Sequence, residues 1–164
     1  MSVSVHWFRR DLRLGDNSAL AEAQRLGDLV LRVFVLDPAL LRRSDIGAPR
    51  VAFLLDCLRE LASDLEKLGS RLIVLRGAPE QQIPSLLRRT GASWVTVHRD
   101  YGPYGRRRDR RVRRRVEEMG ARWIEEPGIL LVAPESCVKD DGRPYTVFTP
   151  FARRWRLAEK EPPR

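Results

Sequence analysis

The stretch LVLRVFVL, residues 29–36, is nearly continuously apolar and rich in β-branched and aromatic side chains. Such a run is typical of a strand that is buried on both faces, as strands are in parallel sheets covered by helices. Similar patterns on either side of it predict further strands. These strands cover residues 3–8, 72–75 and 94–98, with a shorter fifth strand at 122–124.

Segments with helical periodicity separate these strands. The longest places leucines at i, i+3, i+4 and i+7 positions, which predicts an amphipathic helix that ends at Gly69. Asp16 and Asn17 can cap the first helix. The four predicted helices cover residues 19–26, 51–68, 79–91 and 103–120.

The alternation of five strands and four helices predicts the α/β class. We expect a five-stranded parallel Rossmann-like sheet of order 3-2-1-4-5 with helices on both faces. Ligands bind such sheets beyond the carboxyl ends of the strands, at the switch point in strand order. The loops at 9–15 and 99–105 should flank that crevice. This domain is predicted over residues 1–132, with a connector over residues 133–164.

Charge is concentrated in one segment of the chain. The net charge is +9, and residues 99–115 hold nine arginines against Asp100 and Asp109. A basic patch of this kind can attract polyanions, or it can be the solvated face of a helix. Both interpretations stay open on the sequence alone.

Several functional classes lack support in the sequence. No apolar run approaches the roughly 20 residues that span a bilayer, and no signal peptide opens the chain, so a cytoplasmic protein without membrane contact is expected. Cys57 and Cys137 are too few for a disulfide framework and lack metal-ligand spacing. Cys57 is expected in the core, and His6 and His98 as structural histidines with satisfied hydrogen bonds. No metal site and no catalytic residue is predicted.

The loop YGPYG, residues 101–105, is a candidate binding loop. Gly102 and Gly105 would let a flat ligand approach the backbone, and free N–H groups there favour an acceptor or an anion. A simple turn that needs glycine is the alternative. The dinucleotide-binding, P-loop and nucleophile-elbow motifs do not occur.

The segment HWFRRDLRLGDNSAL, residues 6–20, resembles the N-terminal signature of the DNA photolyase and cryptochrome family. Further similarity to that family follows in order along nearly the whole chain. The matching stretches are VFVLDP at 33–38, APRVAFLLDCLRELASDL at 48–65, SRLIVLRGAP at 70–79 and RPYTVFTPFARRW at 143–155.

The resemblance implies the light-harvesting domain of a deoxyribodipyrimidine photolyase, a carbon–carbon lyase. In that family the α/β domain carries an antenna chromophore, which passes excitation energy to FAD in a helical domain. The excited flavin then splits pyrimidine dimers in UV-damaged DNA. We expect the helical FAD domain outside this chain, no repair by this chain alone, and only weak non-specific DNA binding. A cryptochrome-type photosensor and a free-standing nucleotide- or nucleic-acid-binding module are the alternatives.

The resemblance also implies a chromophore class. Family members that bind folate carry an Asn-Glu type pair at the positions of Tyr104 and Gly105, so folate is disfavoured. PYGRRRD, residues 103–109, is similar to members that bind a deazaflavin or FMN. The implied antenna site consists of Phe34, Leu36, Asp37, Arg50, Asp100, Tyr101 and Gly105.

These residues have expected roles in the site. Asp37 and Asp100 would accept hydrogen bonds from the ring, Arg50 would meet a polar or anionic part of it, and Gly105 would leave a slot for it. Two other groups are expected to be structural. They are an ion-paired turn of Arg10, Asp11 and Arg13, and the connector aromatics Tyr145, Phe148, Phe151 and Trp155, which would pack on the helical domain.

Overall fold

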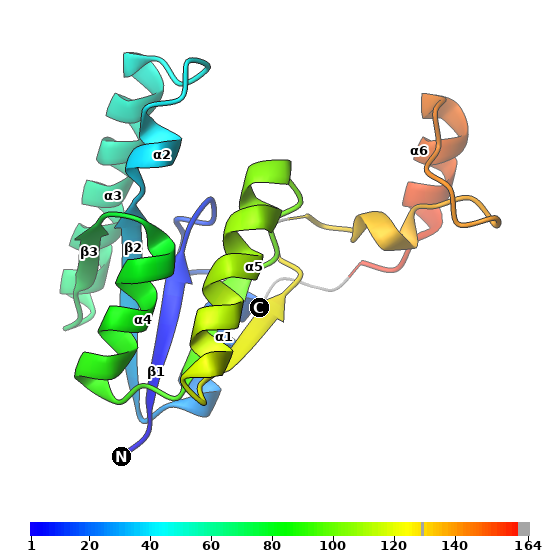
Figure 1. Ribbon diagram of the computed structural model, residues 1–164. Helices are drawn as coiled ribbons and strands as arrows, with labels where there is room; N and C mark the ends of the chain where they lie inside the picture. Colours follow the sequence, from blue (N-terminus) through cyan, green and yellow to red (C-terminus); the bar gives the residue numbers. More distant parts are fainter. Residues whose placement is uncertain (129, 161–164) are drawn as a thin grey trace.

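The computed structural model describes residues 1–128 and 130–160, and its centre is a parallel five-stranded sheet (Figure 1). The strands follow one another in space as β3-β2-β1-β4-β5, which is the predicted order. Three strands match their predicted bounds, while β3 and β5 continue one and two residues further. The strands are β1 (Val3–Phe8), β2 (Leu29–Leu36), β3 (Leu72–Arg76), β4 (Trp94–His98) and β5 (Arg122–Glu126).

Helices cover both faces of the sheet, as predicted. In Figure 1, α4 (Pro79–Thr90) and α5 (Pro103–Glu118) lie in front of the sheet. The other face packs against α1 (Ser18–Leu26) and α3 (Ala48–Lys67). A short helix, α2 (Pro38–Leu41), follows β2 directly and was not predicted.

Local signals in the sequence set the helix ends. The Asn17 side chain accepts a hydrogen bond of 2.9 Å from the Leu20 N–H and caps α1. Prolines occupy the first turns of α4 and α5, where their missing N–H has no helical partner. Gly91 ends α4 with a φ of 66°, in the left-handed region that favours glycine.

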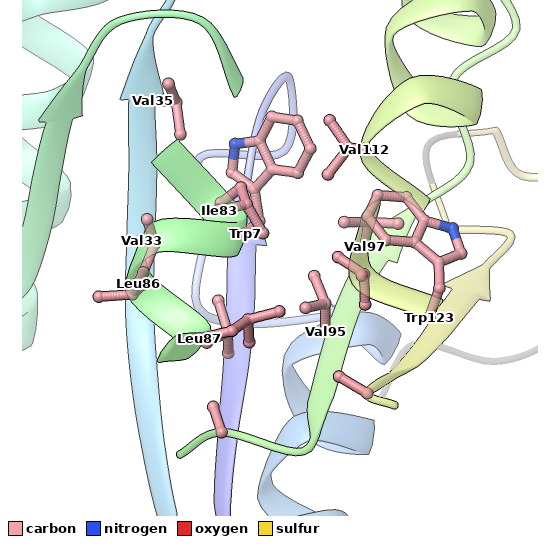
Figure 2. Close-up of a cluster of buried hydrophobic side chains, with 14 residues drawn as sticks. Trp7, Val33, Val35, Ile83, Leu86, Leu87, Val95, Val97, Val112 and Trp123 are labelled. Atoms are coloured by element: carbon pink, nitrogen blue, oxygen red, sulfur yellow. The ribbon is translucent and has the colours of Figure 1, made fainter. Parts of the chain in front are cut away.

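The larger hydrophobic core lies between the sheet and the α4–α5 layer. Figure 2 shows Trp7 from β1 and Trp123 from β5 among aliphatic side chains of both helices. The two indole rings meet edge to face, with centroids 6.3 Å apart. Val112 and Val116 attach α5 to this core, whereas Met119 follows the end of the helix and is exposed.

A second core lies on the opposite face. It joins Phe8 and Phe34 of the sheet to Leu58, Leu61 and Leu65 of α3. Their i, i+3, i+7 spacing is the apolar stripe that the sequence predicts. The expectation of a core position for Cys57 is wrong, because this residue is half-buried and lines a cavity.

The chain after β5 extends away from the sheet, as Figure 1 shows. It contains a 3₁₀ turn at Pro134–Ser136 and α6 (Phe148–Leu157), which has no buried residue. Phe148 is 77% exposed. The domain boundary at residue 132 and the packing of the aromatics on a helical domain stay predictions, and residues 161–164 of the predicted connector lie outside the described residues.

A membrane-spanning helix does not occur in the described part of the chain, where every helix is too short or too polar to cross a bilayer. The cytoplasmic location stays a prediction.

His6 is a fully buried polar residue in the sheet. Its Nδ1 and the Thr96 hydroxyl share a hydrogen bond of 3.1 Å, and its ring meets Phe8 edge-on. Among the described residues its Nε2 has no hydrogen-bond partner, so the expectation of a satisfied histidine holds for only one nitrogen. Burial lowers the pKa of His6 to about 3. Asp11 opposes this shift, while His98, Arg9 and Arg32 add to it.

We expect His6 to make the fold acid-sensitive between pH 6.5 and pH 3. In this window the unfolded chain binds a proton on His6 that the folded chain does not, so the free energy of unfolding falls as the pH falls. The slope from this group is at most about 1.4 kcal/mol per pH unit. Urea unfolding at several pH values measures it, and His6→Asn should lose this component. Equal slopes in both proteins would contradict the expectation.

Candidate functional site

A cavity of about 490 Å³ opens at the carboxyl ends of β1 and β2. Residues 9–13 after β1, the end of β2 and the short helix α2 line it together with the first half of α3. Pro79 and the Arg108 side chain close it from the α4–α5 layer. The cavity therefore lies at the sheet edge where parallel α/β sheets bind ligands, and its volume suits a small organic molecule.

The α3 side of the cavity is apolar. Phe8 and Phe34 come from strands β1 and β2, and Phe53, Leu54 and Cys57 come from α3. Phe53 is 70% exposed, although it stands beside a cavity with aromatic sides. An aromatic or aliphatic ligand would bury this surface.

The opposite side of the cavity is a buried ion cluster. Asp109 of α5 accepts from Arg9 Nη1 at 2.5 Å and from Arg108 Nε at 2.9 Å. Both guanidinium groups stand over the Trp7 ring, with Cζ 5.3 Å and 5.1 Å from the ring centroid. Burial lowers the pKa of Arg9, and the Asp109 carboxylate opposes this shift.

Asp37 and Tyr104 bridge the end of β2 and the start of α5. The Tyr104 hydroxyl donates to one Asp37 oxygen, and the Ala39 N–H donates to the other at 3.0 Å, which caps α2. Burial and the hydrogen bond to Asp37 raise the pKa of Tyr104 to about 12. Asp37 therefore lines the cavity while one of its carboxylate oxygens accepts a hydrogen bond from the Tyr104 hydroxyl.

The loop after β4 is closed by Asp100. Its carboxylate accepts from the Gly102 N–H at 3.0 Å and from Arg108 Nη2 at 3.3 Å. A Cβ on Gly105 would lie 2.8 Å from the Asp100 Cβ and would overlap its carboxylate. The predicted open slot at Gly105 is therefore wrong, because the Asp100 side chain occupies that space.

We expect Gly105→Ala to lower the free energy of unfolding by about 1–3 kcal/mol, because the new methyl group must displace Asp100 from Arg108. Gly102→Ala is the matched control. Its Cβ would lie 3.4 Å from Asp100 Oδ1, and its extended backbone suits any residue. Guanidinium unfolding of both variants measures the difference. Equal and small losses of unfolding free energy in the two variants would contradict the claim that Asp100 leaves no room for a side chain at Gly105.

The turn after β1 is held by Asp11. His98 Nδ1–H donates to Asp11 Oδ2 at 2.7 Å, while His98 Nε2 accepts from the Ser18 hydroxyl at 3.0 Å. Burial alone would raise the pKa of Asp11, but hydrogen bonds from His98 and the Arg9 N–H lower it to about 2. The predicted structural role agrees with these contacts, although the partner of Asp11 is a histidine rather than an arginine.

The predicted site residues divide into two groups. Phe34 and Asp37 line the cavity. The other five do not: Leu36 packs against the α3-side core, and Arg50 is exposed and donates to the Asp45 carbonyl at 3.0 Å. Tyr101 is half-buried in the loop after β4, beside the filled space between Asp100 and Gly105. Whether these residues bind a chromophore stays a prediction.

Sequence reasoning missed Trp7 and Arg9. Their position in the sequence could have indicated them, because Trp7 lies near the end of the first predicted strand and Arg9 begins the loop that is expected to flank the crevice. Their role depends on Asp109, which is 100 residues away along the chain from Arg9. No local pattern reveals such a contact.

The arginine-rich segment has two distinct faces in α5. Arg108 points inward to the ion cluster, while Arg113 and Arg114 point outward and pair with Glu117 and Glu118. The outer face therefore has the character of a solvated helix face with i, i+4 ion pairs. Weak non-specific DNA binding by this face stays a prediction.

The chain is similar to known proteins both in sequence and in fold. Residues 4–164 match the model of the DNA photolyase family. The chain is 38% identical over 159 residues to the deoxyribodipyrimidine photo-lyase of a Synechococcus species. The aligned region covers 97% of this chain and 33% of that protein.

Two solved structures are similar to the whole chain. A class III photolyase from Agrobacterium tumefaciens superposes with a TM-score of 0.89 at 32% identity, over 99% of this chain and 33% of that one. An archaeal photolyase from Sulfolobus tokodaii, described with two FAD molecules and a novel light-harvesting cofactor, gives 0.87 at 31% identity, over 98% and 36%. The chain thus spans about a third of the length of these relatives.

Proposed function

Because this chain belongs to the DNA photolyase family, we propose that it is the light-harvesting domain of a deoxyribodipyrimidine photolyase. It binds an antenna chromophore, which passes excitation energy to FAD in a helical domain of the parent protein. The parent protein then uses that energy to split pyrimidine dimers in UV-damaged DNA. The observation that supports this proposal best is the cavity at the ends of β1 and β2.

The chromophore is FMN or a deazaflavin. A cavity of about 490 Å³ lies within the range of sites that hold small organic molecules, and its α3 side offers aromatic surface to a flat ring. The second FAD of the Sulfolobus tokodaii photolyase supports a flavin-type ring in this family. Folate is less suited, because Tyr104 and Gly105 stand where folate-binding family members carry an Asn-Glu type pair, so the carboxylate that would hold the pterin is missing.

The predicted residues take different parts in this site. Phe34 packs on the ring, and Asp37 accepts a hydrogen bond from it at the end of β2. Leu36 supports Phe34 from the core. Arg50 does not line the cavity and would have to leave the Asp45 carbonyl to meet a polar part of the ligand. Asp100 does not line the cavity but orients Arg108, which does, while Tyr101 and Gly105 belong to the loop around Asp100.

Titration of the chain with FMN, a deazaflavin and a reduced folate tests this function. We expect a shifted absorbance band and quenched or polarised fluorescence with FMN or the deazaflavin, and weaker binding of the folate. Binding of the folate alone, or of none of the three, would count against the proposal.

A cryptochrome-type photosensor is the alternative, since membership of the family is common to both functions. Light-dependent repair of dimer-containing DNA by the parent protein separates them. Repair supports the lyase, and light-dependent signalling without repair supports the photosensor. The same assay on this chain alone should give no repair.

A further inference from the structure

Arg9, which lines the cavity, carries an unused hydrogen-bond donor. Its side chain is 4% exposed, and Nη1 donates to Asp109. Within residues 1–128 and 130–160, Arg9 Nη2 is buried and has no hydrogen-bond partner. Buried donors in proteins nearly always have an acceptor, and leaving a charged one unpaired is costly.

The neighbours of Arg9 hold the guanidinium in place. Asp109 fixes Nη1, and the face of Trp7 lies against the planar group. The Asp11 carboxylate binds the Arg9 backbone N–H at 2.8 Å and the His98 ring, so both of its oxygens are engaged. The guanidinium is therefore pre-oriented by contacts that leave Nη2 unused.

The same guanidinium lines the cavity opposite the aromatic α3 side. A flat ligand that packs on Phe34 would present its edge toward Arg9. An oxygen on that edge would complete the hydrogen bonding of Nη2 with a charge-assisted bond. A ring without such an oxygen would leave the donor unpaired, as it is in the unliganded chain, and would gain no such bond.

We propose that Arg9 is a specificity-determining residue, which donates from Nη2 to a ring carbonyl oxygen and selects planar heterocycles that carry one. This inference rests on the proposed function, because it concerns the same cavity. It adds the orientation of the ligand, with an oxo-substituted edge toward β1, and the chemical feature on which selection depends. Flavins and deazaflavins both carry such carbonyl oxygens.

The test combines a protein change with a ligand change. Arg9→Lys retains a positive charge for Asp109 but has no second nitrogen for the ligand. The ligands are lumiflavin, a tricyclic ring with carbonyl oxygens, and phenazine, a tricyclic ring without them. We expect Arg9→Lys to weaken lumiflavin binding by about 10- to 100-fold and to leave phenazine binding nearly unchanged.

Infrared difference spectra give a readout that a purely structural role would not change. A carbonyl stretch of bound lumiflavin should lie at lower frequency in the unmodified protein than in the Arg9→Lys variant. Arg113→Lys, on the outer face of α5, is the matched control and should change neither affinity nor frequency.

The outcomes separate the two claims. Equal loss of both ligands in Arg9→Lys, with an unshifted carbonyl band, overturns the role of Arg9 and leaves the proposed function intact. Failure of the unmodified protein to bind any flavin overturns both. If Arg9→Lys does not fold, the affinities of the unmodified protein for the two ligands provide the test. The inference requires lumiflavin to bind at least about 10-fold more tightly than phenazine, and equal affinities overturn it.

Discussion

Replacing Asp109 by asparagine is expected to lower the free energy of unfolding by about 3–5 kcal/mol. Asp109 is 5% exposed, and its two oxygens bind Arg9 and Arg108, which are themselves buried. Asparagine has a similar shape but no charge, so two buried cations would lose their shared counter-charge. Urea unfolding with two independent probes measures the loss.

The matched control for Asp109 lies on the same helix. Glu117 accepts from Arg113 at 2.8 Å, but both side chains are about half exposed. Exposed pairs of this kind contribute about 0–1 kcal/mol, so Glu117→Gln should have little effect. Similar losses in the two variants would contradict the claim that burial makes the Asp109 cluster essential to the fold.

Replacing Cys57 by tryptophan is expected to weaken FMN binding by at least about 100-fold, a cost near 2.7 kcal/mol. Cys57 lies on α3 and lines the cavity, so an indole at this position would fill the space assigned to the ring. Because Cys57 is only half-buried, the fold should tolerate the larger side chain. Fluorescence titration measures the affinity.

Ala52→Trp is the control for the Cys57 variant. Ala52 is exposed on the same helix and does not line the cavity. An indole there adds the same surface without entering the proposed site, so FMN affinity should stay unchanged. Unchanged affinity in Cys57→Trp as well would place the chromophore elsewhere.

The fold could be predicted because its signals are local. Residues 29–36 are apolar on both faces, and the alternation of strands with amphipathic helices leaves few possible topologies. The helix α6 was missed because Pro150 makes its start irregular, although proline is tolerated in a first helical turn. Its apolar residues Phe148, Phe151 and Trp155 recur at i, i+3 and i+7, but none of them is buried in the described chain.

The candidate site was predicted less completely because it depends on side-chain directions. Phe34 and Asp37, which the family resemblance implied, lie at the end of a central strand and line the cavity. The Asp100 carboxylate fills the space beside Gly105, and glycine spacing alone could not show this. Likewise, the contact between Arg9 and Asp109 joins two turns that only the folded sheet brings together.

The most direct measurement is a crystal structure of the chain with bound FMN. The account predicts the ring in the cavity between α3 and the Trp7–Arg9 side, with a carbonyl oxygen within hydrogen-bond distance of Arg9 Nη2. A ring bound over the loop at Tyr101, or at any surface away from the ends of β1 and β2, would contradict it.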